Sequence, residues 1–345
     1  MANNEGYHFD RVDQFSAELT EYVKKNVNPN IDSHRAKWEY IQGEKKPIFY
    51  VVKKNNTTSL LGTQALIHIE GNYKGQRIST GKSECTFIDN ELRGTAAFKE
   101  LYTTFLETAF NENIDIVWGL TSAVKIWKEK LNFDFADFVI HDFILTNSPN
   151  FKAANKKSFV HGFFEKFRSK RKIKNLATRH IGIKAVSELT EEDVQWRKNV
   201  LTKLNTPFFI GSDKAYYSWR ITQNPYITYS IWKFEKEKEM IGYFITSKIK
   251  NRLIIHEWLT CDLKSISEQL HIIRQQLISF HEEIYYFGNL QHPINKAIHE
   301  QWISQGGSVK ISNWAGLVVK SNHPDIDSHD IQNGFINLLW TEGVN

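Results

Sequence analysis

Cysteine is nearly absent from this chain of 345 residues, which has only two. The sequence therefore gives no support for a disulfide framework. Because Cys85 and Cys261 both lie in apolar, strand-like runs, we expect two buried thiols in a reducing compartment. No apolar run approaches the roughly 20 residues that span a bilayer, and the polar start Met1–Gly6 lacks the apolar core of a signal peptide. These absences predict a cytoplasmic protein.

A strong excess of charge of either sign is also missing. The 44 Lys and Arg residues against 39 Asp and Glu give a net charge of +5. This small excess suits an anionic cofactor or sugar nucleotide and does not favour nucleic acid as a partner. The histidines are scattered without the spacing of metal ligands, so we expect no metal site. The length predicts two domains, each large enough for its own core.

One stretch, from Cys85 to Phe110, joins a strand, a loop of small residues and a long helix. The apolar run Cys85–Ile88 predicts a buried strand. A polar turn follows, and then Arg93–Ala97, in which only the arginine is bulky. The next residues predict a helix with one apolar stripe, formed by Phe98, Leu101, Tyr102, Phe105, Leu106, Ala109 and Phe110.

This order of elements is typical of an anion-binding site. The first amides of a helix have no intrahelical partner and lie at the positive end of the helix dipole. Small side chains let an anion approach those amides, and Arg93 can add a charge-assisted contact to a phosphate. The same pattern fits an ordinary strand–helix connection with a surface arginine, so both interpretations stay open at this point.

The segments before and after this stretch predict further strands and helices. Phe9–Val27 has the apolar spacing of an amphipathic helix. The runs Ile48–Lys53 and Leu60–Glu70 predict strands separated by a turn. Further along, the basic run Lys166–Lys174 interleaves with phenylalanines at helical spacing. It predicts a docked linker helix, or alternatively a contact for phosphate, a membrane or nucleic acid.

The second half repeats features of the first in the same order. Gly62 and Gly242 each follow a charged hairpin tip and open an apolar strand. Ile183–Asp193 predicts a new opening strand and helix, with Thr190 as the N-cap. These correspondences predict two tandem duplicated domains. The second half lacks an arginine and a glycine after its own central strand, where it reads Asp262-Leu-Lys-Ser, so we expect one anion site per chain.

The loop Arg93–Phe98 resembles the Arg/Gln-x-x-Gly-x-Gly/Ala loop of the GNAT N-acetyltransferase superfamily, and Trp219–Pro225 is similar to a signature common in tandem members. The resemblance implies an α+β (α/β) chain of two tandem GNAT-like domains, each with a mixed, mostly antiparallel central sheet flanked by helices. The implied division is an N-terminal domain at 1–150, a basic and aromatic linker at 151–180, and a degenerate C-terminal domain at 181–345.

The resemblance also assigns a site. The residues implied to bind coenzyme A, with acetyl-CoA or another acyl-CoA as cosubstrate, are Phe87, Ile88, Arg93, Gly94, Thr95, Ala96, Ala97 and Phe98. Backbone amides near Phe87 and Ile88 would polarise the thioester carbonyl. Glu84, on the same strand, is the candidate general base, with Asp89 and Glu70 as weaker alternatives and a solvent-facing carboxylate as the structural interpretation of Glu84. The chain departs from the family at Ala96, where glycine is usual, and at Lys128, where many members have a tyrosine acid.

Three functions remain after these comparisons of motifs. The first is an acyltransferase that transfers groups other than aminoacyl groups, moving an acetyl group from acyl-CoA to an amine of an amino sugar, sugar nucleotide or similar small molecule. The second is an aminoacyl-tRNA-dependent peptidyl transferase, in which Lys166–Lys174 would meet RNA phosphates. The third is an inactive GNAT-like binding protein, which the departures at Ala96 and Lys128 would explain. The sequence does not determine the oligomeric state.

Overall fold

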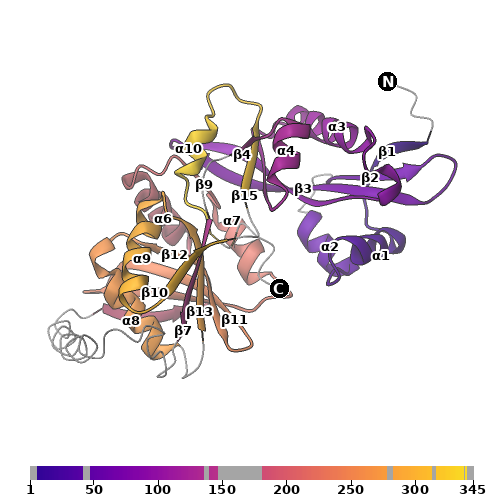
Figure 1. Cartoon of the computed structure of the whole chain (residues 1–345). Helices are drawn as coiled ribbons and strands as arrows, with labels where there is room; N and C mark the ends of the chain where they lie inside the picture. The colour runs from indigo at the N-terminus through magenta and orange to yellow at the C-terminus, as the bar shows by residue number, and fades with distance from the viewer. Residues whose placement is uncertain are drawn as a thin grey trace, which may run out of the picture. The chain divides into compact units, whose positions relative to one another are not determined.

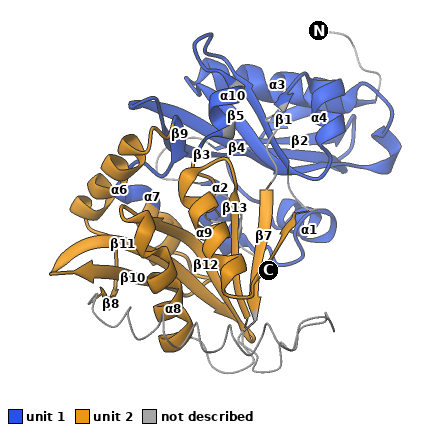
Figure 2. Cartoon of the chain, turned by 60° about the vertical axis from the view of Figure 1, so that its left-hand side comes forward, with its two compact units in different colours: residues 1–138, 207–216, 313–334 blue, residues 139–206, 217–312, 335–345 orange. Residues whose placement is uncertain are grey.

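The computed structural model describes residues 6–41, 47–135, 140–146, 181–277, 283–312, 316–337 and 339. The expected linker at 151–180, including Lys166–Lys174, lies outside these residues. The chain forms two compact units (Figure 2): unit 1 holds residues 1–138, 207–216 and 313–334, and unit 2 holds residues 139–206, 217–312 and 335–345.

Unit 1 is built on an eight-stranded sheet in the order β1-β2-β3-β4-β5-β15-β6, with β9 paired to β3. Among the described strands of this sheet, only β4 and β5 pair in parallel. Its elements are β1 (Tyr7–Arg11), α1 (Ala17–Asn26), α2 (Ser33–Tyr40), β2 (Ile48–Lys54), β3 (Leu60–Tyr73), β4 (Gln76–Ile88), the 3-10 turn η1 (Asn90–Leu92), α3 (Ala97–Asn111), β5 (Ile116–Thr121), α4 (Val124–Leu131), β6 (Asp134–Phe135), β9 (Phe208–Ile210), β15 (Gly316–Ser321) and α10 (Ser328–Gln332).

Helices cover both faces of this sheet (Figure 1). On one face α3 buries its apolar stripe in a core that includes Tyr102, Phe105 and Trp127 of α4. On the other face α1 and α2 pack against β3, where Phe15 and Tyr40 contact the ring of Phe49. The alternation of side chains along the strands separates these two layers.

Unit 2 has a seven-stranded sheet in the order β14-β7-β13-β12-β11-β10-β8. Here β12 and β13 form the parallel pair that corresponds to β4 and β5. Its elements are β7 (Ile140–Thr146), β8 (Ile181–Val186), α6 (Glu191–Lys203), the π-helical turn η2 (Ser218–Thr222), β10 (Tyr229–Lys236), β11 (Glu239–Ile249), β12 (Arg252–Thr260), the 3-10 turn η3 (Leu263–Ser265), α8 (Ile266–Gln276), β13 (Glu283–Asn289), α9 (Pro293–Ser304) and β14 (Ser308–Ile311), while the short α7 (Lys214–Tyr217) crosses the boundary between the units.

The two units exchange one strand each. β7, from the first half of the chain, pairs with β13 and β14 in unit 2, and β15, from the end of the chain, pairs with β5 and β6 in unit 1. The compact units therefore do not follow a sequential division at 1–150, 151–180 and 181–345. Each exchanged strand lies between two strands of the receiving sheet and completes its ladder there.

The expected fold class of two tandem GNAT-like α+β domains with mixed, mostly antiparallel sheets is confirmed. The predicted N-cap is also confirmed, because Thr190 and Asp193 form a reciprocal capping box at the start of α6. The glycine correspondence holds too: Gly62 lies opposite Ile88 and Gly242 opposite Thr260, each at the end of its central strand.

Two expectations are wrong. The helix expected over Phe9–Val27 begins only at Ala17, after Ser16 caps it, because the preceding residues form β1 and pair with β2. Cys261 is exposed, whereas Cys85 is buried as expected; Cys261 follows the last residue of β12 and so lies outside the buried strand. Within the described part of the chain, no helix combines the length and apolarity needed to cross a membrane.

Candidate active site

The central strand of unit 1 carries a bulge at the residues expected to meet the thioester. Thr63 of β3 pairs with Phe87 and Ala65 pairs with Glu84, so one residue of β3 faces two residues of β4. Cys85, at this bulge, has a left-handed φ of 55°, which is costly for a residue with a side chain. The Thr63 hydroxyl donates to the carbonyl of Cys85 at 2.7 Å and stabilises this local geometry.

Beyond the middle of the sheet, β4 and β5 part from each other. Their parallel ladder ends at Lys82 and Trp118, although β4 continues to Ile88 and β5 to Thr121. The backbone of β4 from Glu84 onward therefore lacks a ladder partner on its β5 side among the described strands. Polar backbone groups that face such a gap are available to a ligand.

The loop after β4 presents unpaired amides at the start of α3. Arg93–Ala96 is exposed, and Gly94 has a φ of 83° with no atom within 4 Å of the place a Cβ would occupy. Ala96 is the N-cap and makes no side-chain cap bond, while the amide of Ala97 donates to the Thr95 hydroxyl at 3.2 Å. Within the described residues, the amides of Ala96, Phe98 and Lys99 have no partner, so they can receive an anion.

Arg93 uses one of its donors within the protein and keeps the others exposed. Its Nε donates to the carbonyl of Ile88 at 3.3 Å, which holds the side chain at the end of β4. The residue is exposed, so the guanidinium keeps further donors for a phosphate.

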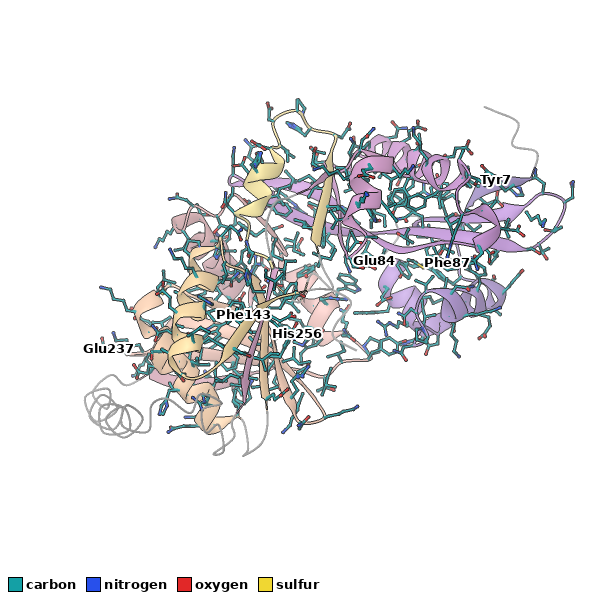
Figure 3. The ribbon with its side chains drawn as sticks, viewed as in Figure 1. Tyr7, Glu84, Phe87, Phe143, Glu237 and His256 are labelled. Carbon is teal, nitrogen blue, oxygen red and sulfur yellow. The ribbon has the colours of Figure 1, made fainter. Side chains whose placement is uncertain are left out.

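The candidate base Glu84 is not a free surface carboxylate. It forms an ion pair with Lys82, whose side chain is only 4% exposed, and is itself 21% exposed. Figure 3 shows Glu84 and Phe87 on the side of the sheet where α1 and α2 lie. The ion pair places the Glu84 carboxylate beside a buried ammonium group on the same strand.

A tyrosine from α1 also reaches this part of β4. The ring of Tyr22 meets that of Phe87 edge to face, with 6.0 Å between centroids. Its hydroxyl is shielded from solvent and has no hydrogen-bond partner in the structure. Burial, and then the charge of Asp89, raises the pKa of Tyr22. This hydroxyl is therefore a neutral donor beside the bulge.

The corresponding loop of unit 2 is shorter. Asp89 caps η1 and Asp262 caps η3 in the same way, each accepting from the amide two residues later. In unit 2 the helix α8 follows η3 directly, whereas in unit 1 the four residues Arg93–Ala96 stand between η1 and α3. Among the described segments, only unit 1 therefore has a four-residue loop between the 3-10 turn and the helix that follows.

In unit 2 the residue that corresponds to Glu84 is Glu257, and its carboxylate is buried. The β12–β13 ladder ends at Ile255, and Glu257 follows two residues later, as Glu84 follows Lys82. Glu257 is 1% exposed, and the groups that donate to it are Arg197 at 2.9 Å, Tyr217 at 3.1 Å, Asn337 at 2.6 Å and Tyr243. A carboxylate with these partners is a structural group and is not available as a base.

Of the comparisons with known proteins, only the one with solved structures found matches, and these share one fold. No protein-family model matches the sequence, and no curated protein matches it either. Among solved structures, a GCN5-related N-acetyltransferase from Anabaena variabilis matches with a TM-score of 0.62 and 14% identity, covering 91% of this chain and 72% of that one. A probable N-acyltransferase from Enterococcus faecalis matches with a TM-score of 0.59 and 10% identity over 91% of this chain and 72% of that one.

A third match is to an enzyme solved with a long-chain acyl-CoA. Saccharomyces cerevisiae N-myristoyltransferase, solved with bound myristoyl-CoA and inhibitors, matches with a TM-score of 0.57 and 9% identity over 91% of this chain and 80% of that one. The chain therefore has the fold of GCN5-related N-acetyltransferases, present as two tandem units. The match to N-myristoyltransferase extends over most of both chains.

The structure brings most of the predicted site residues together and places the side chains of Lys82 and Tyr22 beside them. Glu84, Phe87 and Ile88 lie on the diverging part of β4, and Arg93–Phe98 forms the loop and first turn of α3. Sequence reasoning did not assign a role to Lys82 or Tyr22. Lys82 lies in a polar stretch that gave no strand signal, and Tyr22 matched the apolar face of a helix, so neither had a distinguishing pattern. The described residues hold no group of three or more potential ligands arranged for a metal ion.

Proposed function

We propose that the protein is an acyl-CoA-dependent N-acyltransferase that transfers the acyl group directly to an amine in a ternary complex. The proposal depends on two features that occur together in unit 1. The strands β4 and β5 separate, and the exposed loop after β4 leads into a helix whose first amides are unpaired among the described residues. The fold shared with N-acetyltransferases and N-myristoyltransferase supports it.

The residues have separate roles in this proposal. The unpaired amides at Ala96, Phe98 and Lys99, with Arg93, bind the pyrophosphate of coenzyme A. The thioester lies in the gap, where amides near Phe87 and Ile88 polarise its carbonyl oxygen. Holding both reactants in this geometry removes several kcal/mol from the barrier.

The proton of the amine leaves toward Glu84. The amine nitrogen attacks the thioester carbonyl, the bond from carbon to sulfur breaks, and coenzyme A leaves as a thiolate, which takes a proton from solvent to become the thiol. Glu84, which forms an ion pair with Lys82, accepts the proton that the amine loses. The acceptor we propose is a small molecule, such as an amino sugar or sugar nucleotide, with acetyl-CoA as donor in the cytoplasm.

The experiment combines binding with turnover. A thermal-shift screen with acetyl-CoA, longer acyl-CoAs and free coenzyme A should raise the melting temperature, since a ligand at 100 times its Kd stabilises a protein by about 2.7 kcal/mol. Release of free thiol should then require an amine from a panel of amino sugars, sugar nucleotides and polyamines. Binding without thiol release from any amine would favour an inactive binding protein, and failure of both would refute the proposal.

A further inference from the structure

Four side chains behind the bulge, three of them buried and that of Thr86 half-buried, form a closed ring of hydrogen bonds. The amide of Gln64 donates to the Ser83 hydroxyl at 2.8 Å, and the Thr86 hydroxyl donates to the Gln64 carbonyl oxygen at 2.6 Å. The Tyr102 hydroxyl lies 2.8 Å from that of Thr86 and 3.1 Å from that of Ser83. The second amide hydrogen of Gln64 goes to the carbonyl of Ala65 at 2.9 Å.

The direction of every bond in this ring is fixed by counting hydrogens. A hydroxyl has one hydrogen, and Thr86 uses its own on Gln64, so Tyr102 must donate to Thr86. Tyr102 then has no hydrogen left, so Ser83 must donate to Tyr102. Each of the four side chains gives one bond to the next and accepts one from the previous, so the three buried members, Gln64, Ser83 and Tyr102, are satisfied within the ring.

The ring encloses the bulge on three elements. Ser83 and Thr86 lie on β4 on either side of Glu84 and Cys85, Gln64 lies opposite them on β3, and Tyr102 comes from α3. Tyr102 is therefore the one member of the ring that joins the bulged strand β4 to α3, the helix that begins directly after the loop Arg93–Ala96. It is fully buried at 0% exposure.

We infer that Tyr102 is a positioning residue for the transfer reaction. It holds the bulge of β4 at a fixed distance from α3, so that the amides of β4 can bind the thioester while the first amides of α3 bind the pyrophosphate. The inference rests on the proposed function. A residue at a strained φ keeps that conformation only while its surroundings hold it there, so the bulge can shift when the ring is broken. A misplacement of about 1 Å in a site can reduce the rate by about 100-fold.

The test compares two tyrosines that lie in the same core. Tyr50 of β2 donates to Thr108 of α3 at 2.7 Å, so it makes the same kind of strand-to-α3 bond away from the bulge. Tyr102→Phe should lower kcat by about tenfold to 100-fold while KM for acetyl-CoA changes by less than about threefold. Tyr50→Phe should leave both within about twofold.

Hydrogen exchange supplies a readout that needs no turnover. The amides of residues 83–88 should exchange at least about tenfold faster in Tyr102→Phe than in the wild type, and at the wild-type rate in Tyr50→Phe. Should Tyr102→Phe fail to fold, Thr86→Val breaks the same ring and should give the same two changes.

Three results would overturn the inference: kcat unchanged in the ring variants, exchange unchanged at residues 83–88, or equal effects from Tyr50→Phe. A wild type without turnover would instead refute the proposed function, and the exchange comparison would still decide whether Tyr102 holds the bulge.

Discussion

Replacing Ala96 by glutamate should weaken coenzyme A binding without weakening the fold. Ala96 is the N-cap of α3, is exposed, and has no side-chain cap bond. A carboxylate at this end of a helix interacts favourably with the helix dipole, by about 0.3–1 kcal/mol. The thermal stability of the free protein should therefore stay the same or rise slightly.

The effect on affinity should have the opposite sign. The new carboxylate would occupy the amides of Phe98 and Lys99, which have no partner among the described residues, and would repel a pyrophosphate. Loss of one charge-assisted hydrogen bond costs about 1.5–3 kcal/mol, which corresponds to an affinity about 10- to 150-fold lower.

Isothermal titration calorimetry with free coenzyme A measures this affinity and the stoichiometry together. The matched control is Ser267→Glu, which adds the same charge to the first turn of α8, the corresponding helix of unit 2. We expect one site per chain in the wild type and in the control, with unchanged affinity in the control. Two sites per chain, or undiminished binding by Ala96→Glu, would refute the assignment of the loop.

Two further predictions concern Glu84 and the buried histidines. Glu84→Gln should lower kcat by about 100- to 10,000-fold with little change in acyl-CoA affinity, and a loss below about threefold would leave water or the substrate as the base. Burial lowers the pKa of both His256 and His292 from 6.5 to about 3, with Arg220 and Arg197 adding to the respective shifts. Between pH 6.5 and 3, therefore, the unfolded chain protonates these histidines while the folded chain does not. The free energy of unfolding should fall by about 1.3 kcal/mol per histidine on going from neutral pH to about pH 5.5. Denaturant unfolding at both pH values should show this loss roughly halved in His256→Gln and unaltered in the exposed-residue control His8→Gln; an equal loss in all three proteins would contradict the histidine assignment.

The parts of the site that were predictable from the sequence are those that local chemistry determines. Small residues before an apolar stripe of period 3.6 predicted the loop and α3, and their positions agree with the structure to within a residue. The first half of β4 gave no such signal, because its polar side chains are buried by specific partners. Thr80, for example, donates to the carbonyl of Ile69 and accepts from the Trp118 indole, and a periodicity argument treats such a residue as exposed.

The tertiary features of the site could not be derived in this way. The bulge at Cys85 depends on the register between β3 and β4, and the ring through Tyr102 depends on how α3 packs against that register. Both are set by contacts between distant segments, which hydrophobic patterning does not encode. The strand at residues 9–11 was mistaken for helix for the same reason, since its apolar spacing fits either element and only pairing with β2 decides between them.

Through the strand exchange, the C-terminal half completes the sheet that carries the proposed site of unit 1. β15, from residues 316–321, pairs with every residue of β5 from Ile116 to Thr121, and β5 is the strand that forms one wall of the gap beside β4. Without β15, β5 would be an edge strand with unpaired backbone groups along one side, and the wall that faces the thioester would lose its support. The C-terminal half therefore contributes to the proposed site of unit 1 through a strand, even though its own central carboxylate, Glu257, is enclosed by Arg197 and Tyr217.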